Sequence, residues 1–451
     1  MVTDRITEWL AGLAYDDIPP EVIDKARLMI LDSVGVAIGG RDEPAVDHLL
    51  AVIGSRDAED DVPIFGRRVR APAPSAALIN GAMAHVLDYD DTLLPSRLHA
   101  SGGLTAGLTA IGHQEDLPGR DLLVGFVAGF EIAARFAAAV HPHAFDLGWH
   151  NAGFVCPVGV AAGAGAMLDS DRETIARSFG IASSQSSGVR AHLGTMTKSL
   201  NVGHGAQAGV MSALLARQGF TANPRILDDR ADGFLRLFAP QGPGDMDSGL
   251  GGEWMVLQDG FKPYACGVKL HAAIDGALRL RRRLNLDPAR IERVEVSAAR
   301  GARWVEGSPV LPATELEGKF SMYYVVAAAL IAGHGFPSLF DHDQLTRPDI
   351  GELMSRSVVL LDPDLRQDQA RVSVTVDGET HSEFVQAAIG TAGNPMSQTD
   401  LVDKFRHMVE PALGARPSTD LIQTLLTLEE VSVRRLTALT VPEVSSAFRH
   451  R

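Results

Sequence analysis

The hydrophobic pattern of this 451-residue chain changes its period twice. Residues 1–255 carry apolar side chains at helical spacing, residues 256–394 include segments that alternate apolar and polar residues as strands do, and residues 395–451 return to helical spacing. A helical tail that follows a mixed segment can rejoin the helices that precede it. The pattern therefore predicts a mainly α fold, with a large all-helical domain built from 1–255 and 395–451 and a smaller α+β domain over 256–394.

The predicted helices of the first part are rich in small residues. Prolines mark two of the helix starts, and the expected helices cover residues 21–40, 76–91, 121–140, 156–168, 172–184 and about 202–217. Small side chains recur at three- and four-residue spacing, at Ala161 and Gly165 and again at Gly205, Ala208, Gly209 and Ala213. This spacing favours close contact between helices.

The middle segment predicts a sheet. Asp377-Gly378 supplies the turn of a hairpin between two alternating runs. The expected strands are Ile291–Ser297, Val358–Leu361, Arg371–Val376 and Glu379–Ala387, and the expected helices are Val268–Leu284 and Phe320–Ala332. We expect an α+β domain whose sheet is antiparallel.

Charge and cysteine content exclude several classes of protein. The chain has 41 Lys and Arg against 56 Asp and Glu, and its net charge of −15 disfavours nucleic acids and anionic membrane surfaces as partners. Its two cysteines are too few for a disulfide scaffold, a four-cysteine zinc site or an iron–sulfur cluster. Low cysteine content and an N-terminus without a signal pattern favour a cytoplasmic protein. Glu131 and Arg135 inside the apolar run Leu122–Val140 favour a core helix over a membrane span.

Acidic residues are missing from two segments of this acidic chain. Thr174 to Leu227, 54 residues, contains no Asp or Glu, and neither does Gly260 to Ile274. One interpretation is a local anion-binding pocket lined by the cations of these segments. The other is a set of buried helices in which no charge is tolerated.

The segment His85–His99 combines three aspartates with histidine. Asp88, Asp90 and Asp91 follow a predicted helix and precede a proline-containing loop that ends at His99. The carboxylates can orient the imidazole for proton transfer, they can hold Mg²⁺ or Ca²⁺, or they can cap a helix and a turn. The residues alone leave these three interpretations open.

Two further segments offer histidine and lysine. His141 and His143 form an H-x-H pair that can bind zinc, although no further ligand set is evident, and His150 lies in a glycine-flanked loop as a pocket residue or as a histidine bonded to the backbone. Lys198 can anchor a carboxylate or form a Schiff base with a carbonyl cofactor such as pyridoxal phosphate. The glycines after it resemble a dinucleotide loop only loosely, because no strand precedes them.

A last group of candidates lies where the predicted domains meet. The segment FKPYACGVKLH supplies Lys262, Tyr264 and His271. Ligands often bind at domain boundaries, so this position supports a role in binding.

Taken in order, these motifs resemble those of the MmgE/PrpD family. The matching segments are Asp88–Thr92 (D-Y-D-D-T) with His99, Gly148–His150 (G-W-H), Lys198–His204 (K-S-L-N-V-G-H), Lys262–His271 (K-P-Y-x-C…H), Ser321–Val325 (S-M-Y-Y-V) and Asn394–Ser397 (N-P-M-S). They extend through nearly the whole chain. The family includes 2-methylcitrate dehydratases, cis-aconitate decarboxylases and iminodisuccinate epimerases, and the resemblance implies a helical domain with an α+β lid domain, usually as a homodimer.

The resemblance also implies a site between the two domains that works without a cofactor or metal. Positions that match the family's motifs are assigned to catalysis (Asp88, His99, His150, Lys198, Tyr324) and to substrate binding (Thr92, Lys262, His271). Lys269 is an additional cation within the Lys262 motif. The loop that often ends in His-Pro in the family has His99-Ala100 here, so substrate specificity does not carry over.

The sequence thus predicts a lyase that moves a proton next to a carboxylate. Lysines and His271 would bind the carboxylates of a small di- or tricarboxylate, and His99 and His150 would move the proton. Dehydration and decarboxylation both fit. The alternatives are an epimerase or isomerase of a dicarboxylate, a pyridoxal-phosphate enzyme that uses Lys198, and a carboxylate-binding protein without activity.

Overall fold

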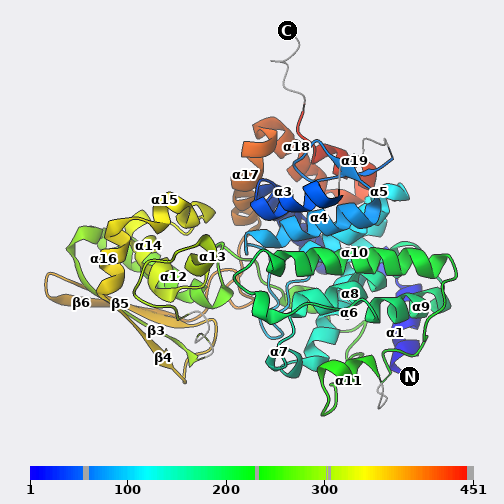
Figure 1. Ribbon diagram of the computed structural model, residues 1–451, viewed down its shortest axis with the longest axis horizontal. Helices are drawn as coiled ribbons and strands as arrows, with labels where there is room; N and C mark the ends of the chain where they lie inside the picture. The colour runs from blue at the N-terminus through cyan, green and yellow to red at the C-terminus, as the bar shows by residue number, and fades with distance from the viewer. Residues whose placement is uncertain (54–59, 229–232, 301, 303–305, 444–451) are drawn as a thin grey trace, which may run out of the picture. The chain divides into compact units, whose positions relative to one another are not determined.

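The computed structural model describes residues 1–53, 60–228, 233–300, 302 and 306–443 and divides into two compact units (Figure 1). The helical unit comprises Met1–Val86, Asp90–Asp259 and Ser397–Arg451. The α+β unit comprises Leu87–Tyr89 and Gly260–Met396. The fold is mainly α with a small α+β part, as the periodicity predicts.

The helical unit is built around a group of glycine- and alanine-rich helices. The central helices are α4 (Ala73–Val86), α5 (Ser101–Gln114), α6 (Gly119–Val140), α8 (Asn151–Met167) and α10 (Thr197–Arg217). Around them are α1 (Val2–Gly12), α2 (Pro20–Gly39), α3 (Pro44–Ile53), α7 (His143–Asp146), α9 (Arg172–Ser183), α11 (Phe234–Phe238), α17 (Gln398–Leu413), α18 (Ala415–Leu426) and α19 (Val433–Leu439), with a two-residue ladder of β1 (Val62–Pro63) and β2 (Arg70–Ala71). Because α17 and α18 pack on α2, the two ends of the chain share one core.

Small residues lie where these helices cross. A Cβ atom on Gly205 would stand 2.7 Å from the Cβ of Cys156, and one on Gly209 would overlap the side chain of Val160. A Cβ on Gly203 would overlap the carbonyl oxygen of Leu78 in α4. The predicted close contact between helices is therefore confirmed, and α10 approaches α4 and α8 at backbone distance.

The apolar helix α6 lies inside this group. It is long and apolar enough to cross a membrane by length and composition, but 94% of its most apolar window is buried within the protein. Glu131 accepts a hydrogen bond from the backbone N–H of Val256 at 3.0 Å and pairs with Arg135 at 3.3 Å. These contacts identify α6 as a core helix of the helical unit.

Several helix ends differ from the prediction. The helix expected to reach residue 91 ends at Val86, because Asp88 has φ 55° and cannot continue a right-handed helix. α8 begins at Asn151 and α10 at Thr197, each five residues before the expected start, so Lys198 lies in the first turn of α10. α5 was not predicted, because its glycines obscure the helical pattern.

The α+β unit contains one four-stranded sheet, with strand order β4-β3-β5-β6. Its strands are β3 (Ile291–Ala299), β4 (Ser357–Asp362), β5 (Ala370–Val376) and β6 (Glu379–Val385). Helices α12 (His271–Leu284), α14 (Met322–Ala332) and α16 (Pro348–Ser355) pack against it, and α13 (Glu315–Lys319) and α15 (His342–Leu345) are short (Figure 1). Asp377 and Gly378 both have positive φ, which confirms the predicted hairpin turn.

The prediction of a fully antiparallel sheet is wrong for one pair. β3 pairs with β5, and β5 with β6, in antiparallel register, but β3 and β4 are parallel from Val294–Ser357 to Ala299–Asp362. The connection between β3 and β4 carries four helices, α13 to α16, and a connection of that length can return the chain in the same direction.

Candidate functional site

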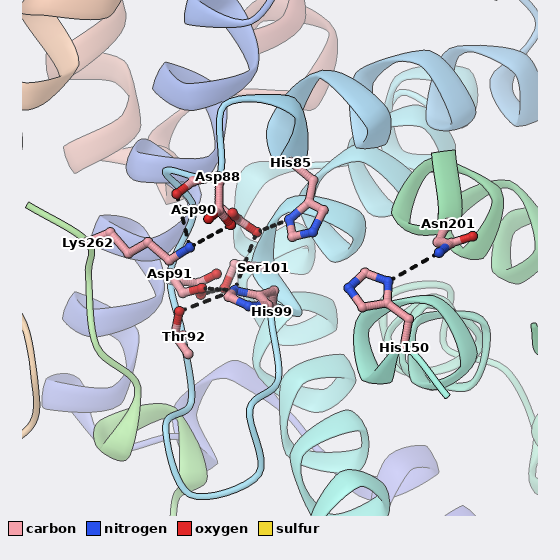
Figure 2. Close-up of polar contacts among 10 residues, drawn as sticks. All are labelled: His85, Asp88, Asp90, Asp91, Thr92, His99, Ser101, His150, Asn201 and Lys262. Atoms are coloured by element: carbon pink, nitrogen blue, oxygen red, sulfur yellow. Dashed lines mark hydrogen bonds and ion pairs between the residues drawn. The ribbon is translucent and has the colours of Figure 1, made fainter. Parts of the chain in front are cut away.

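The loop after α4 carries three of the predicted site residues, Asp88, Thr92 and His99. It runs from Leu87 to Ala100, where α5 begins, and an antiparallel bridge between Leu93 and Leu98 closes it. Asp90, Asp91 and Thr92 are buried, although they belong to a loop. A buried loop must satisfy its polar groups internally, and the contacts drawn in Figure 2 show how this loop does so.

His99 is fixed by the backbone of the same loop. Its Nδ1 lies 2.7 Å from the carbonyl oxygen of Asp91 and 3.2 Å from Oγ1 of Thr92. Because a carbonyl can only accept, Nδ1 carries a hydrogen. The side chain is 16% exposed. The fold therefore sets Nε2 as the nitrogen of His99 that gains or loses a proton.

Behind His99, Asp91 belongs to a buried group of carboxyls. Its carboxylate accepts a hydrogen bond from the Ser101 hydroxyl and interacts with Asp259, whose carbonyl oxygen is 2.8 Å from Nζ of Lys25. Burial raises the pKa of Asp91 to about 6, and burial and the neighbouring Asp91 hold the pKa of Asp259 well above its usual value. The two carboxyls thus hold a proton to a higher pH than ordinary aspartates do.

His85 faces Asp90 from the last turn of α4. The His85 Nδ1 and Asp90 Oδ2 atoms are 2.7 Å apart, and both side chains are buried. The same carboxylate oxygen is 3.8 Å from Nδ1 of His99. The His85 ring lies 5.2 Å from the His99 ring and 5.6 Å from the His150 ring, measured between centroids (Figure 2). Three imidazoles and one carboxylate therefore form a single cluster.

His150 reaches the cluster from the N-cap position of α8. Its backbone N–H donates to the carbonyl of Gly188, and the side-chain amide of Asn201 in α10 donates to its Nδ1 over 3.4 Å. The pKa of His150 is lowered well below its usual value, first by burial and then by His85, Lys198 and His99. His150 is therefore neutral, with its proton on Nε2.

Lys198 completes the candidates of the helical unit. It lies in the first turn of α10, one turn before Asn201, and is 5% exposed. Its positive charge is one of the causes that lower the pKa of His150. The helical unit thus groups four of the predicted residues, namely Thr92, His99, His150 and Lys198.

In the α+β unit, Lys262 pairs with Asp88. The Lys262 ammonium donates to the carboxylate and to the backbone carbonyl of Asp88, each at 3.0 Å, and Lys262 is 1% exposed. The pair explains how Asp88 keeps its left-handed φ, because a buried cation holds both its side chain and its carbonyl.

The other candidates of the α+β unit interact within its own core. The Tyr324 hydroxyl donates to the carbonyl of Leu339, and the side chain is fully buried. Nε2 of His271 donates to the carbonyl of Cys266 at 3.3 Å, and Lys269 is half-buried in the turn before α12. The assignments of Tyr324 to catalysis and of His271 and Lys269 to substrate binding remain predictions.

The three aspartates of the loop have three different partners. Asp88 binds Lys262, Asp90 binds His85 and Asp91 binds Ser101. α5 begins after Ala100 without a side-chain cap, so none of the aspartates caps that helix. Within the described residues, no group of three or more His, Cys, Asp or Glu side chains is arranged to hold a metal ion. The interpretation that an aspartate orients a histidine fits Asp90 best.

Sequence reasoning missed His85, Asn201, Ser101 and Asp259. His85 was not selected because a histidine on the apolar face of a helix gives the same signal as a buried structural histidine. Its spacing to Asp90 becomes informative only once α4 is known to end at Val86. Asn201 is three residues after Lys198 on α10, so a prediction that started this helix at Thr197 would have placed both on one face.

Comparison with protein families identifies the chain. The model of the MmgE/PrpD N-terminal domain matches residues 4–245, and that of the MmgE/PrpD C-terminal domain matches residues 264–430. The chain belongs to the MmgE/PrpD family. The resemblance drawn from the motifs is thereby confirmed.

Curated relatives of this MmgE/PrpD protein share nearly its whole length. The cis-aconitate decarboxylase of Homo sapiens is 28% identical over 99% of this chain and 96% of the relative, and that of Mus musculus is 29% identical over 95% and 90%. The cis-aconitate decarboxylase of Aspergillus terreus is 26% identical over 90% and 88%. These relatives are carboxy-lyases, which supports an enzyme of the lyase class at the level of the family.

Proposed function

We propose that this MmgE/PrpD protein is a carboxy-lyase that decarboxylates a small tricarboxylate of the cis-aconitate type. The names and full-length coverage of the relatives support the reaction class. The cluster of His99, His150 and Lys198 in the helical unit supports proton transfer next to a carboxylate.

The observation that carries the proposal is the difference between the two imidazoles. The fold uses Nδ1 of His99 for a hydrogen bond to the backbone, so that Nε2 is the nitrogen that exchanges a proton, and it places a hydrogen on Nε2 of His150. Because burial and nearby positive charge keep His150 neutral, its N–H serves as a hydrogen-bond donor to a carboxylate rather than as an acid. His99, which is part-exposed, is the group that exchanges protons with solvent.

The reaction consumes one proton in each turnover. The bond between carbon and the departing carboxylate breaks, CO₂ leaves, and the electron pair spreads through the adjacent double bond toward a remaining carboxylate. Lys198 and the His150 N–H stabilise this developing negative charge. Protonated His99 then delivers its Nε2 proton to carbon and recovers a proton from solvent. We propose that Lys262, His271 and Lys269 bind further carboxylates.

The test is an NMR screen of the purified protein in D₂O. Citrate, 2-methylcitrate, cis-aconitate and iminodisuccinate are each incubated with enzyme, and the spectra report carbon–deuterium exchange, loss of water, loss of CO₂ and epimerisation together. We expect cis-aconitate to lose CO₂ and to gain one deuterium on carbon. If water loss or epimerisation were the only change, the protein would be assigned that activity in place of decarboxylation. If no acid changed, the result would support a binding protein instead.

We further propose that the protein works as a homodimer. Five large apolar side chains between residues 189 and 211 are exposed by 37–49%, namely Val189, Leu193, Met196, Leu200 and Met211. This segment contains no acidic residue, so two copies would meet without carboxylate repulsion from it. Light scattering after gel filtration should give twice 48.0 kDa, and Leu200→Glu with Met211→Glu should give 48.0 kDa.

A further inference from the structure

His85 lies at the centre of the imidazole cluster but has no part in the proposed chemistry. Its side chain is 0% exposed, and its helix α4 is held against α10 by the Gly203 contact. Its ring is near both His99 and His150. Figure 2 shows the three rings together, with Asp90 on the side of His85 and His99.

Asp90 determines how His85 is oriented. The 2.7 Å bond to Asp90 Oδ2 places the hydrogen of His85 on Nδ1, because a carboxylate can only accept. The same oxygen faces Nδ1 of His99 at 3.8 Å. A change in the charge of the Asp90–His85 pair therefore acts on His99 through Asp90 and on His150 through the His85 ring.

We propose that His85, held by Asp90, is a positioning residue that keeps the His99 and His150 rings in their different tautomers, with Nε2 of His99 as the nitrogen that exchanges a proton and Nε2 of His150 as a hydrogen-bond donor. This inference rests on the proposed proton-transfer function. His85 does not contact substrate in this proposal. It acts by packing against both rings and by holding the buried Asp90–His85 pair next to them.

The charges around His85 within the helical unit support this role. Asp90, His99 and His150 lie next to the ring, the charge of Lys198 acts on His150, and the charge of Asp90 acts on Asp91 and Asp32. After burial, His85 is the largest single cause of the low pKa of His150. Buried pairs contribute little net stability, so the Asp90–His85 pair is better explained by its effect on its neighbours than by stability of the fold.

His113 is a matched control for His85. It is also a buried histidine of the helical unit, 5% exposed, and its Nδ1 makes one side-chain hydrogen bond of 2.7 Å, to the hydroxyl of Thr437. It lies near the opposite end of α5 from His99, about 20 Å along a helix of this length. His113→Asn thus removes an equally buried ring without touching the cluster.

The kinetic experiment compares His85→Asn, Asp90→Asn and His113→Asn with wild type. Asparagine can still donate from the Nδ1 position but has no ring to pack and no site to titrate. We expect His85→Asn to lower kcat roughly 10- to 100-fold with KM changed less than about threefold, and to move the limb of the kcat/KM pH profile that belongs to His99. Asp90→Asn should move the same limb, and His113→Asn should leave both unchanged. A His85→Asn enzyme with a wild-type pH profile would overturn the proposal, whatever its kcat.

A second measurement does not depend on activity. Nitrogen-15 NMR titration of the histidine side chains reports the tautomer and pKa of each imidazole in the resting protein. In His85→Asn we expect the pKa of His150 to rise, and in His113→Asn we expect no change. If wild type decarboxylates nothing but this shift occurs, the proposed function fails and the positioning role stands. If wild type is active and the shift is absent, the positioning role fails alone. Folding of each variant is checked by circular dichroism, and Asp90→Asn provides the second variant if His85→Asn does not fold.

Discussion

The two units of this protein use their buried polar side chains in opposite ways. In the helical unit, His85 of α4, His99 of the following loop and His150 at the N-cap of α8 come together with the carboxylate of Asp90. In the α+β unit, buried polar groups join secondary-structure elements: Tyr264 donates to Asp275 at 2.5 Å, and Asp275 accepts the backbone N–H of Ile389 at 2.7 Å. The difference teaches that the helical unit gathers buried imidazoles, to which we assign proton transfer, whereas the α+β unit uses its buried polar groups mainly to hold its own fold together.

Helix packing explains part of this difference. Small residues let α4, α8 and α10 approach closely, so side chains at their ends converge. A sheet covered by helices needs hydrogen bonds from polar side chains at its edges and turns, because backbone N–H and C=O groups of the strands have no partner strand there. Lys262, bound to Asp88, is the main exception, since it places a buried charge next to a strained loop.

The largest expected effect is on kcat, and it distinguishes His99 of the helical unit from Tyr324 of the α+β unit. His99→Gln should lower kcat by about 10²- to 10⁴-fold, because it removes the proton donor to carbon. Tyr324→Phe tests the catalytic role that the motif implies for Tyr324. Because its hydroxyl donates to the Leu339 carbonyl, we expect the opposite of that role, namely a change in kcat of less than about threefold and a loss of about 1 kcal/mol of stability. Steady-state kinetics and denaturant melts measure both. An equal loss of kcat in the two variants would break the comparison between the units.

The lysines test whether both units contribute charge. Lys198→Ala and Lys262→Ala should each cost about 2–4 kcal/mol in transition-state binding, which is roughly 30- to 1000-fold in kcat/KM. Lys262→Ala should also destabilise the fold by about 3–5 kcal/mol, because Asp88 is left buried without its cation. Adding Asp88→Asn should restore stability but not activity. Wild-type kinetics for both single variants would exclude an anion site at these lysines.

Buried carboxyls predict that the free energy of unfolding depends on pH, with the clearest case at Glu131 in the helical unit. Burial raises the pKa of Glu131 in α6 from 4.5 to about 7. Between these two pH values the folded state keeps a proton on Glu131 that the unfolded chain has lost. This protonation contributes about 3 kcal/mol to the free energy of unfolding, fully below pH 4.5, and the contribution is lost as the pH rises to about 7. Glu131→Gln should remove this slope from unfolding free energies measured between pH 4.5 and 7. Asp275→Asn tests the same effect in the α+β unit, where burial raises the pKa of Asp275 and hydrogen bonds from Tyr264 and Ile389 oppose the rise.

Glycine substitutions compare a helix–helix contact with a helix–sheet contact. Gly203→Ala in α10 should destabilise the protein by about 1–3 kcal/mol or more, because its Cβ meets the backbone oxygen of Leu78. Gly276→Ala in α12 should cost less, because its Cβ meets a side-chain methyl of Val372 at 2.7 Å, which can turn away. Thermal melts rank the two, and the reverse order would show that the sheet is the less adaptable surface.

The smallest expected effect concerns metal ions. We expect EDTA followed by gel filtration to leave activity unchanged, because the aspartates of the loop after α4 are bound to protein groups. Loss of activity that one divalent ion restores would contradict this expectation and would reassign Asp88, Asp90 and Asp91.

Local signals explain which elements could be predicted from sequence. Proline at the start of α2 and Asp377-Gly378 at the β5–β6 turn impose their conformation through their own backbone, so these features were found. α5 was missed because its glycines serve contacts with distant helices, as Gly107 does with Val160. The parallel pairing of β3 with β4 depends on a long connection, which no short pattern encodes.

The candidate site was predictable only as far as motifs reach. Family motifs selected His99, His150 and Lys198, which the fold brings into one unit. They did not reveal that the His99 hydrogen is on Nδ1 or that Asn201 fixes the His150 tautomer, because those facts depend on three-dimensional contacts. His85 belongs to the same class, since its partner Asp90 lies beyond the end of its helix.

The shared core of the two chain ends has a consequence for synthesis on the ribosome. Asp32 of α2 is buried, and its carboxylate lies 2.7 Å from the ammonium of Lys404 in α17, which is 372 residues later in the chain. Until Lys404 has been translated, a nascent chain that closes this core must trap an acid without its counter-ion. The N-terminal helices should therefore remain incompletely packed and accessible to chaperones until the ribosome translates the last tenth of the chain.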